Sequence, residues 1–101
     1  MKFLLIGDEY TVLGYNLVGI QGVAVSDGQE AADALRAATQ DTDVGVVLIT
    51  QRIASEIKPL VDEAKLKMAT PIVLEIPDRR GTVEGRESAL DIVRRLIGIK
   101  V

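Results

Sequence analysis

The 101-residue sequence contains no cysteine and no histidine, and only 3% of its residues are aromatic. Without cysteine, the chain can form neither a disulfide framework nor a thiolate metal site. Without histidine, it lacks the commonest general base, the usual partner of a serine or cysteine nucleophile, and the commonest transition-metal ligand. These absences exclude most hydrolase and metalloenzyme chemistries. We therefore predict a non-catalytic module with no catalytic, cofactor-binding or metal-binding residues.

Long apolar runs are absent too. The longest, residues 44–49, is about a third of the roughly 20 residues that a membrane-spanning helix needs. Nothing near the N-terminus resembles a signal peptide. The net charge of −3 argues against nucleic acid as a general partner, because binding to phosphates needs clustered basic groups. We expect a soluble, cytoplasmic protein that neither binds nucleic acid nor inserts into a membrane.

The charges are distributed unevenly along the chain. Residues 1–50 contain two basic and seven acidic groups, whereas residues 51–101 contain ten basic and eight acidic ones. This asymmetry has two interpretations: a solvated surface, or a basic C-terminal tip that meets an acidic partner.

Apolar runs alternate with helical patterns in the order βαβαβαβα, with strands expected at 3–6, 23–25, 44–49 and 72–74. The run at 44–49 is continuously apolar, as in a strand covered on both faces, and we place it at the centre of the sheet. The order predicts a single small doubly wound α/β domain, similar to receiver domains and flavodoxins. Its four-stranded parallel sheet has helices on both faces.

Capping and breaking residues give the expected helix bounds. Thr11 is a candidate N-cap of the first helix, and Ser26 or Asp27 caps the second, from about 29 to 39. Thr50 opens the third, where Pro59 predicts either a kink or two short helices. The first helix is expected to pack through residues at near-helical spacing: Val12, Leu13, Leu17 and Val18.

Within the single domain, 1–101, we distinguish a sheet core at 1–77, an exposed loop at 78–86, and a C-terminal helix and tail at 87–101. The apolar residues of the last helix span an arc of about 160°, wider than the stripe of about 100° that a core-facing helix requires. This helix can therefore be docked loosely, with part of its arc available to a partner.

The turns after the strands are where a doubly wound sheet binds ligands. The glycines that follow Gly7 do not have dinucleotide-binding spacing, and no lysine follows a glycine as in a P-loop. Asp8 and Glu9 are similar to the metal-holding acids of receiver domains. However, the third strand ends in Thr50 and Gln51, without a phosphoacceptor aspartate. We expect the two acids to stabilise the N-terminus of the first helix instead.

Two other groups of polar residues have both a functional and a structural interpretation. Glu75 is the best-placed carboxylate for catalysis, but we favour its structural interpretation, a strand-end residue that accepts a hydrogen bond from a loop amide. Arg79, Arg80 and Arg86 form a basic loop that either receives an anion or an acidic surface, or is simply solvated.

Four segments, taken in order, resemble the F subunit of archaeal-type and vacuolar-type rotary ATPases. They are residues 7–20 (GDEYTVLGYNLVGI), 49–54 (ITQRIA), 74–77 (LEIP) and 93–99 (VRRLIGI). The resemblance extends over nearly the whole chain. Gln51 stands where the family usually has glutamate, which places in doubt any ion pair that relatives make there.

The resemblance implies a non-catalytic subunit of the central stalk that is peripheral to the membrane. It would bind the coiled-coil D subunit and couple ATP synthesis or hydrolysis in the A/B head to proton or sodium transport. It further implies that the C-terminal helix contacts the head and modulates hydrolysis, with partner-binding residues Val93, Arg94, Arg95 and Ile97. The alternative is a degenerate receiver-like module that binds a protein without being phosphorylated.

Overall fold

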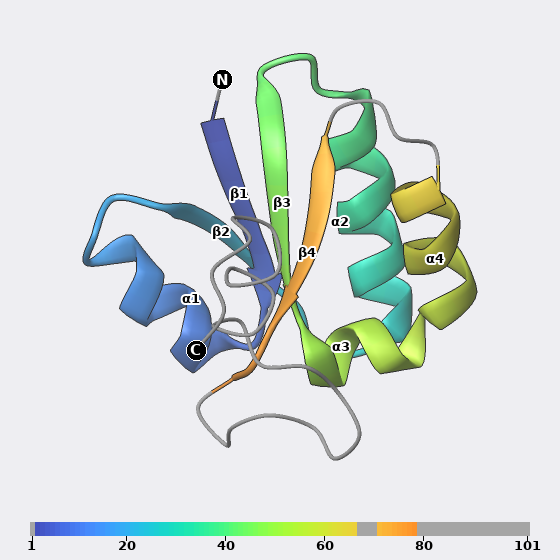
Figure 1. Ribbon diagram of the computed structural model, residues 1–101. Coiled ribbons are helices and arrows are strands. Elements are labelled where there is room, and N and C mark those ends of the chain that lie inside the picture. Colours follow the sequence, from blue (N-terminus) through green and yellow to red (C-terminus); the bar gives the residue numbers. More distant parts are fainter. Residues whose placement is uncertain (1, 67–70, 79–101) are drawn as a thin grey trace, which may run out of the picture.

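The computed structural model describes residues 2–66 and 71–78 (Figure 1). The elements follow one another as β1 (Lys2–Gly7), α1 (Glu9–Asn16), β2 (Gln21–Ala24), α2 (Gly28–Gln40), β3 (Val44–Thr50), α3 (Gln51–Glu56), α4 (Lys58–Leu66) and β4 (Ile72–Ile76). The predicted helix and tail at 87–101, and all of the predicted loop except Asp78, lie outside the described residues.

All strand pairs in the sheet are parallel, and the strand order is β2-β1-β3-β4. In the register, Leu5 of β1 lies between Gly22 of β2 and Leu48 of β3. The chain passes from β1 to β2 on one side and then crosses to β3 on the other, so the topological switch point lies between β1 and β3. The prediction that residues 44–49 form an interior strand is confirmed.

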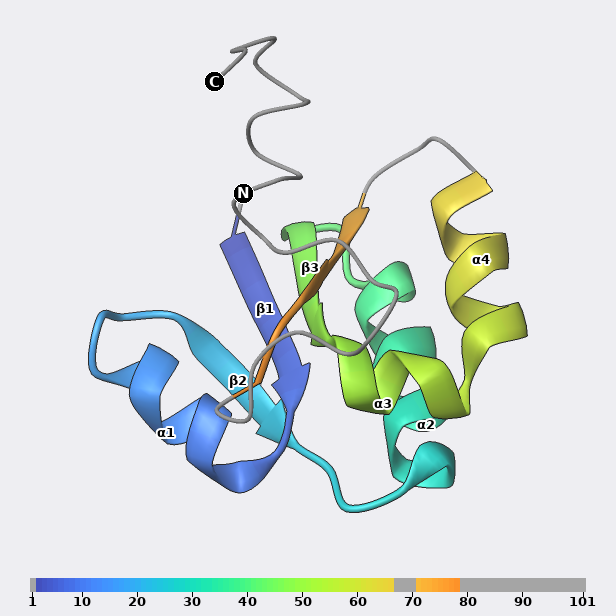
Figure 2. The same cartoon turned by 60° about the horizontal axis from the view of Figure 1, so that its bottom comes forward.

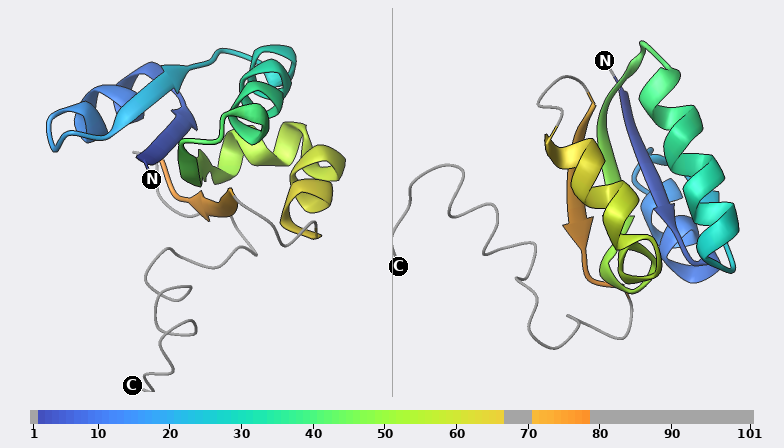
Figure 3. Two further views of the ribbon diagram at one scale, coloured as in Figure 1. Left: turned by 90° about the horizontal axis from the view of Figure 1, so that it is seen from above. Right: turned by 90° about the vertical axis from the view of Figure 1, so that its right-hand side faces the viewer.

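Helices cover both faces of the sheet, which confirms the predicted fold class (Figures 1 and 3). On one face α2, α3 and α4 pack over a core that includes Ile6, Leu35, Val47 and Ile49, each at most 1% exposed. On the other face α1 covers a smaller cluster of Leu5, Val12 and Ile76. Figure 2 shows α1 lying apart from the other three helices.

Pro59 separates two helices, one of the two outcomes predicted for it. α3 ends at Glu56 and α4 begins at Lys58. Pro59 is therefore the second residue of α4, where a missing backbone N–H leaves no intrahelical hydrogen bond unmade.

The predicted start of the first helix is wrong, because α1 begins at Glu9 with Asp8 as its N-cap. The Asp8 carboxylate accepts hydrogen bonds from the backbone N–H groups of Tyr10 and Thr11, each at 3.1 Å, and from the Thr11 hydroxyl at 2.6 Å. A carboxylate preceding the helix satisfies more of the unpaired N–H groups than a hydroxyl at Thr11 could. Asp27 is the N-cap of α2, and it was one of the two residues, Ser26 and Asp27, predicted for this position.

Gly19 and Gly22 have different roles around the end of α1 and the start of β2. Gly19 makes the turn after α1 with a φ of +88°, a conformation that other residues rarely adopt. Gly22 lies within β2 and faces α1, where a Cβ atom would come within 2.9 Å of Val12 Cγ1. It therefore allows α1 to lie close against the edge strand.

Candidate functional site

The carboxyl ends of the strands surround a hollow of about 410 Å³ at the topological switch point. This is the position at which open α/β sheets bind ligands. Its lining includes the acidic residues Asp8, Glu9, Glu56 and Asp78, together with Arg52.

Asp8 has a structural role in this hollow. Burial alone would raise the pKa of its carboxyl group, but the hydrogen bonds from Thr11 and from the backbone N–H of Tyr10 outweigh this effect and hold the pKa below its ordinary value. The carboxylate is therefore ionised and directed toward the N-terminus of α1, where a negative charge is favourable. This agrees with the helix-stabilising role predicted for it.

Thr50 occupies the position at the end of β3 where a receiver domain would carry its phosphoacceptor. The side chain is 1% exposed, and a Cβ atom at Gly7 would lie only 2.7 Å from its methyl carbon. No group of three or more potential metal ligands occurs within residues 2–66 and 71–78. The hollow thus has the location of a receiver site but no acceptor carboxylate at the end of β3.

Arg52 links two edges of the hollow. Its Nε lies 3.1 Å from a carboxylate oxygen of Asp78, whose side chain is only 2% exposed. This ion pair joins the start of α3 to the segment after β4, 26 residues further along the chain. A buried carboxylate requires such a partner, so the guanidinium of Arg52 is committed to the fold.

Glu75 forms an ion pair as well. The structural interpretation of this residue had predicted a hydrogen bond from a loop amide, not a charged partner. Its side chain is 9% exposed, and its Oε2 contacts the ammonium group of Lys65 near the end of α4. The pair fastens α4 to β4 and gives Glu75 a structural role.

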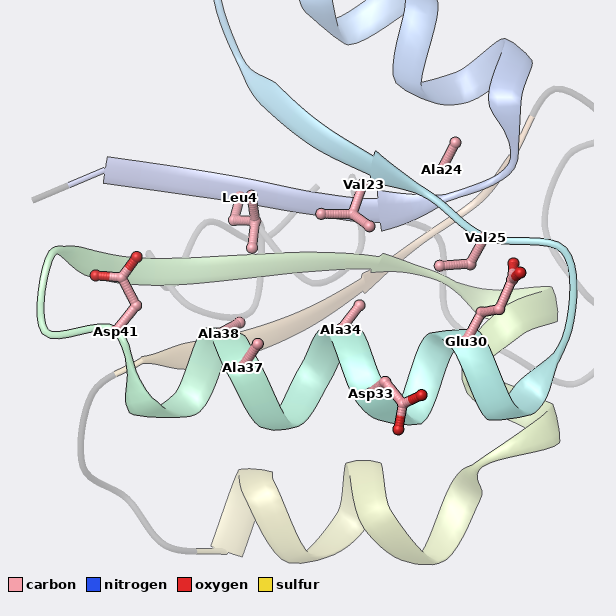
Figure 4. A pocket seen from close by; sticks show the side chains of 10 residues that line it. All are labelled: Leu4, Val23, Ala24, Val25, Glu30, Asp33, Ala34, Ala37, Ala38 and Asp41. Carbon is pink, nitrogen blue, oxygen red and sulfur yellow. The ribbon is translucent and has the colours of Figure 1, made fainter.

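A groove of about 540 Å³ lies between β2 and α2 (Figure 4). Alanines 34, 37 and 38 line its helical wall, and their small side chains leave it open. The carboxylates at its margin serve the fold: Glu30 accepts a hydrogen bond from the Ser26 N–H, Asp33 pairs with Arg36, and Asp41 pairs with Lys2. The groove therefore offers small apolar contacts without a convergent polar group.

The side of α1 that points away from the sheet carries a surface that sequence reasoning missed. Of the apolar residues predicted to pack this helix, only Val12 is buried, whereas Leu13 is 59%, Leu17 82% and Val18 73% exposed. Tyr10, on the same side, is 63% exposed. The signal was present in the sequence, because Val12, Leu13, Leu17 and Val18 do not all fall on one side of a helix, and a helix can bury only the side that faces the sheet.

The residues predicted to bind partners, Val93, Arg94, Arg95 and Ile97, lie outside the described residues. The same holds for Arg79, Arg80 and Arg86 of the predicted basic loop. In the described part of the chain, no helix is long and apolar enough to cross a membrane.

The fold and its surfaces define a class: a small receiver-like α/β domain in which Asp8, Glu75 and Asp78 are engaged in the domain's own structure, with an exposed apolar helix. Comparison with known proteins makes this specific. Residues 4–96 match the family of the ATP synthase (F/14-kDa) subunit, and the chain therefore belongs to this family of F subunits.

Individual relatives support this assignment along the whole chain. The F subunit of the A-type ATP synthase of Pyrococcus furiosus is 36% identical, over 100% of this chain and 98% of that protein. The corresponding protein of Methanocaldococcus jannaschii is 31% identical, over 100% and 99%. The crystal structure of the V-type ATP synthase F subunit from Archaeoglobus fulgidus matches with a TM-score of 0.65 and 25% identity, covering 74% of this chain and 95% of that chain.

Proposed function

We propose that the chain is a non-catalytic rotor subunit in the central stalk of an A/V-type ATP synthase or ATPase. It binds the D subunit of the stalk and couples ATP synthesis or hydrolysis in the A/B head to proton or sodium transport. It does so on the cytoplasmic side, peripheral to the membrane. The full-length similarity to the F subunits of A-type ATP synthases is the observation that carries this proposal.

The packing of the domain suits a part that transmits force. Leu5, Ile6, Val47 and Ile49 on the two interior strands are completely buried, and close-packed interiors of this kind have low compressibility and transmit strain. Ion pairs join α3 and α4 to the segment that contains β4. A rigid sheet domain docked on a coiled coil can rotate with it.

We further propose that the C-terminal segment, 87–97, contacts the catalytic head and modulates ATP hydrolysis. Its sequence combines an apolar arc with Arg94 and Arg95, which can form charge-assisted hydrogen bonds to acidic groups. The α1 side of the sheet offers a surface for the apolar arc, since Phe3 is 45% and Ile72 56% exposed there. The segment can thus alternate between the sheet and a partner.

The test uses the full chain with Arg94 and Arg95 both replaced by alanine. We expect an unchanged melting temperature, together with weaker assembly with the D subunit or an altered ATPase rate of the reconstituted head. The control replaces Arg36 and Lys58, two cations with exposed side chains on α2 and α4, and should behave as the unmodified chain. Unchanged assembly and an unchanged rate would remove these two arginines from the interface.

The receiver-like alternative, a module that binds a protein without being phosphorylated, predicts no association with the D subunit. Incubation with acetyl phosphate tests separately for a functional receiver domain, in which Asp8, directly after β1, is the candidate acceptor. Because Asp8 is held by Tyr10 and Thr11, and Thr50 occupies the acceptor position, we expect no labelling. Labelling, or a failure to associate with the D subunit, would contradict the stalk assignment.

A further inference from the structure

Gly14 lies within α1, and the described packing does not explain why it is glycine. A Cβ atom at this position would meet nothing within 4 Å, whereas at Gly7 and Gly22 it would approach a neighbouring side chain to 2.7 and 2.9 Å. Glycine within a helix is less favourable than alanine because it loses more backbone freedom on folding. No contact within the described domain offsets this cost at Gly14.

The neighbours of Gly14 form a continuous apolar surface. Tyr10, Leu13 and Leu17 follow one another at i, i+3 and i+7, and Gly14 lies four residues after Tyr10 and three before Leu17, so these residues of α1 and its C-cap lie on one side of the helix. That face points away from the sheet, and the three side chains are 63%, 59% and 82% exposed. We call Tyr10, Leu13, Gly14 and Leu17 the α1 outer face. Exposed apolar patches of this kind mark interaction sites.

The charges around the α1 outer face are of one sign. Residues 3–35 contain no lysine or arginine, and the N-terminal end of the face adjoins Asp8 and Glu9, with Glu56 on the same hollow. Among the described residues that line the hollow, Arg52 is the basic one, and it forms an ion pair with Asp78. An occupant is therefore favoured if it presents apolar side chains along the face and a basic side chain at this end.

We infer that the α1 outer face seats an amphipathic helix of a partner subunit, whose backbone approaches most closely at Gly14 and whose lysine or arginine meets Glu9. A residue without a side chain lets two helix axes come near each other, and the flanking Leu13 and Leu17 pack into the facing grooves. A second copy of this chain fits less well, since its own outer face brings no basic group to Glu9. The inference rests on the proposed function for the existence of a partner subunit.

The experiment measures the affinity of the full chain for the purified D subunit. Gly14→Leu and Leu17→Glu should each weaken binding at least tenfold. The leucine side chain would keep the partner helix from approaching α1 closely, and the glutamate would place a charge in the apolar contact. Leu66→Glu is the matched control, since Leu66 is 78% exposed on α4, and it should leave the affinity unchanged. Glu9→Lys should also weaken binding, whereas Asp43→Lys, in the turn before β3, should not.

Thermal melts separate binding from folding. Gly14→Ala should melt above the unmodified chain, and Gly14→Leu and Leu17→Glu should melt within a few degrees of it, because their side chains enter open space.

Each outcome is decisive. If the unmodified chain does not bind the D subunit, the proposed function fails, and the inference that rests on it fails with it. If the unmodified chain binds and the outer-face variants bind as well as Leu66→Glu, the surface is wrong while the proposed function stands. If the variants instead convert a dimer of this chain into monomers without changing the affinity for the D subunit, the occupant is a second copy, and the inference is overturned.

Discussion

Replacing Gly22 by alanine should destabilise the domain, because α1 lies against this position of β2. The new methyl group would lie 2.9 and 3.1 Å from the two methyl carbons of Val12 and 3.4 Å from the Leu5 carbonyl oxygen. Val12 cannot turn away easily, since a β-branched side chain in a helix has one strongly preferred rotamer. Its surroundings are also filled, with the side chain packed beside Leu5 and Ile76.

The magnitude follows from two opposing effects. Overpacking of a filled core costs about 1–3 kcal/mol, and the loss of glycine's backbone freedom in the unfolded chain returns about 0.4–1 kcal/mol. The net effect of Gly22→Ala is a loss of about 1 kcal/mol, which lowers the melting temperature by about 4–8 °C in a domain of this size. Gly14→Ala has only the second effect, since its methyl group meets nothing, and should raise the melting temperature by a few degrees.

Thermal and urea denaturation of the two alanine variants test this contrast directly. A double-mutant cycle with Val12→Ala isolates the contact, because removing the Val12 methyls should abolish the penalty of Gly22→Ala. An unchanged or raised melting temperature of Gly22→Ala would contradict the clash with Val12. An equal effect of Gly22→Ala in the Val12→Ala background would contradict it as well.

Three further predictions concern the core, the cap of α1 and a buried ion pair. Leu35→Ala should cost about 2–5 kcal/mol in urea unfolding, because this side chain is 1% exposed in the main core. Asp8→Ala should cost about 0.5–2 kcal/mol. Because the folded pKa of Asp8 lies below its ordinary value of 3.8, its contribution to stability is complete above that value and is lost as the pH falls through the folded pKa. Asp8→Asn should therefore keep much of the cap while flattening the acid end of a stability-against-pH curve, and an unaltered curve would contradict this assignment. Lys65→Ala, which removes the cation beside the buried Glu75 carboxylate, should cost about 1–3 kcal/mol. Lys58→Ala, which breaks an exposed ion pair, should change the stability by at most about 0.5 kcal/mol. Equal losses of stability in Lys65→Ala and Lys58→Ala would show that burial does not determine how much these ion pairs contribute.

The positions of the strands along the chain were accessible from the sequence because their signals are local and strong. The apolar run at 44–49 falls within β3, and the break at Pro59 falls where α3 gives way to α4. The N-cap of α1 was misplaced by three residues, because Asp8 and Thr11 are both good capping residues. Only the three hydrogen bonds to the Asp8 carboxylate distinguish them.

Composition, periodicity and ordered motifs were sufficient to predict the fold class, to exclude histidine and cysteine chemistry, and to identify the resemblance to the F subunit of rotary ATPases. They were not sufficient to separate the core residues of α1 from its surface residues, which depends on how the helix packs on the sheet. Val12 and Leu17 are equally apolar, but one faces the sheet and the other faces solvent. The reason is geometric: a helix buries the side that its neighbours cover, and the placement of α1 depends on the close approach at Gly22, 10 residues further along the chain than Val12. The absent cysteine and histidine restrict the chemistry of the chain, whereas its exposed surface is decided by packing.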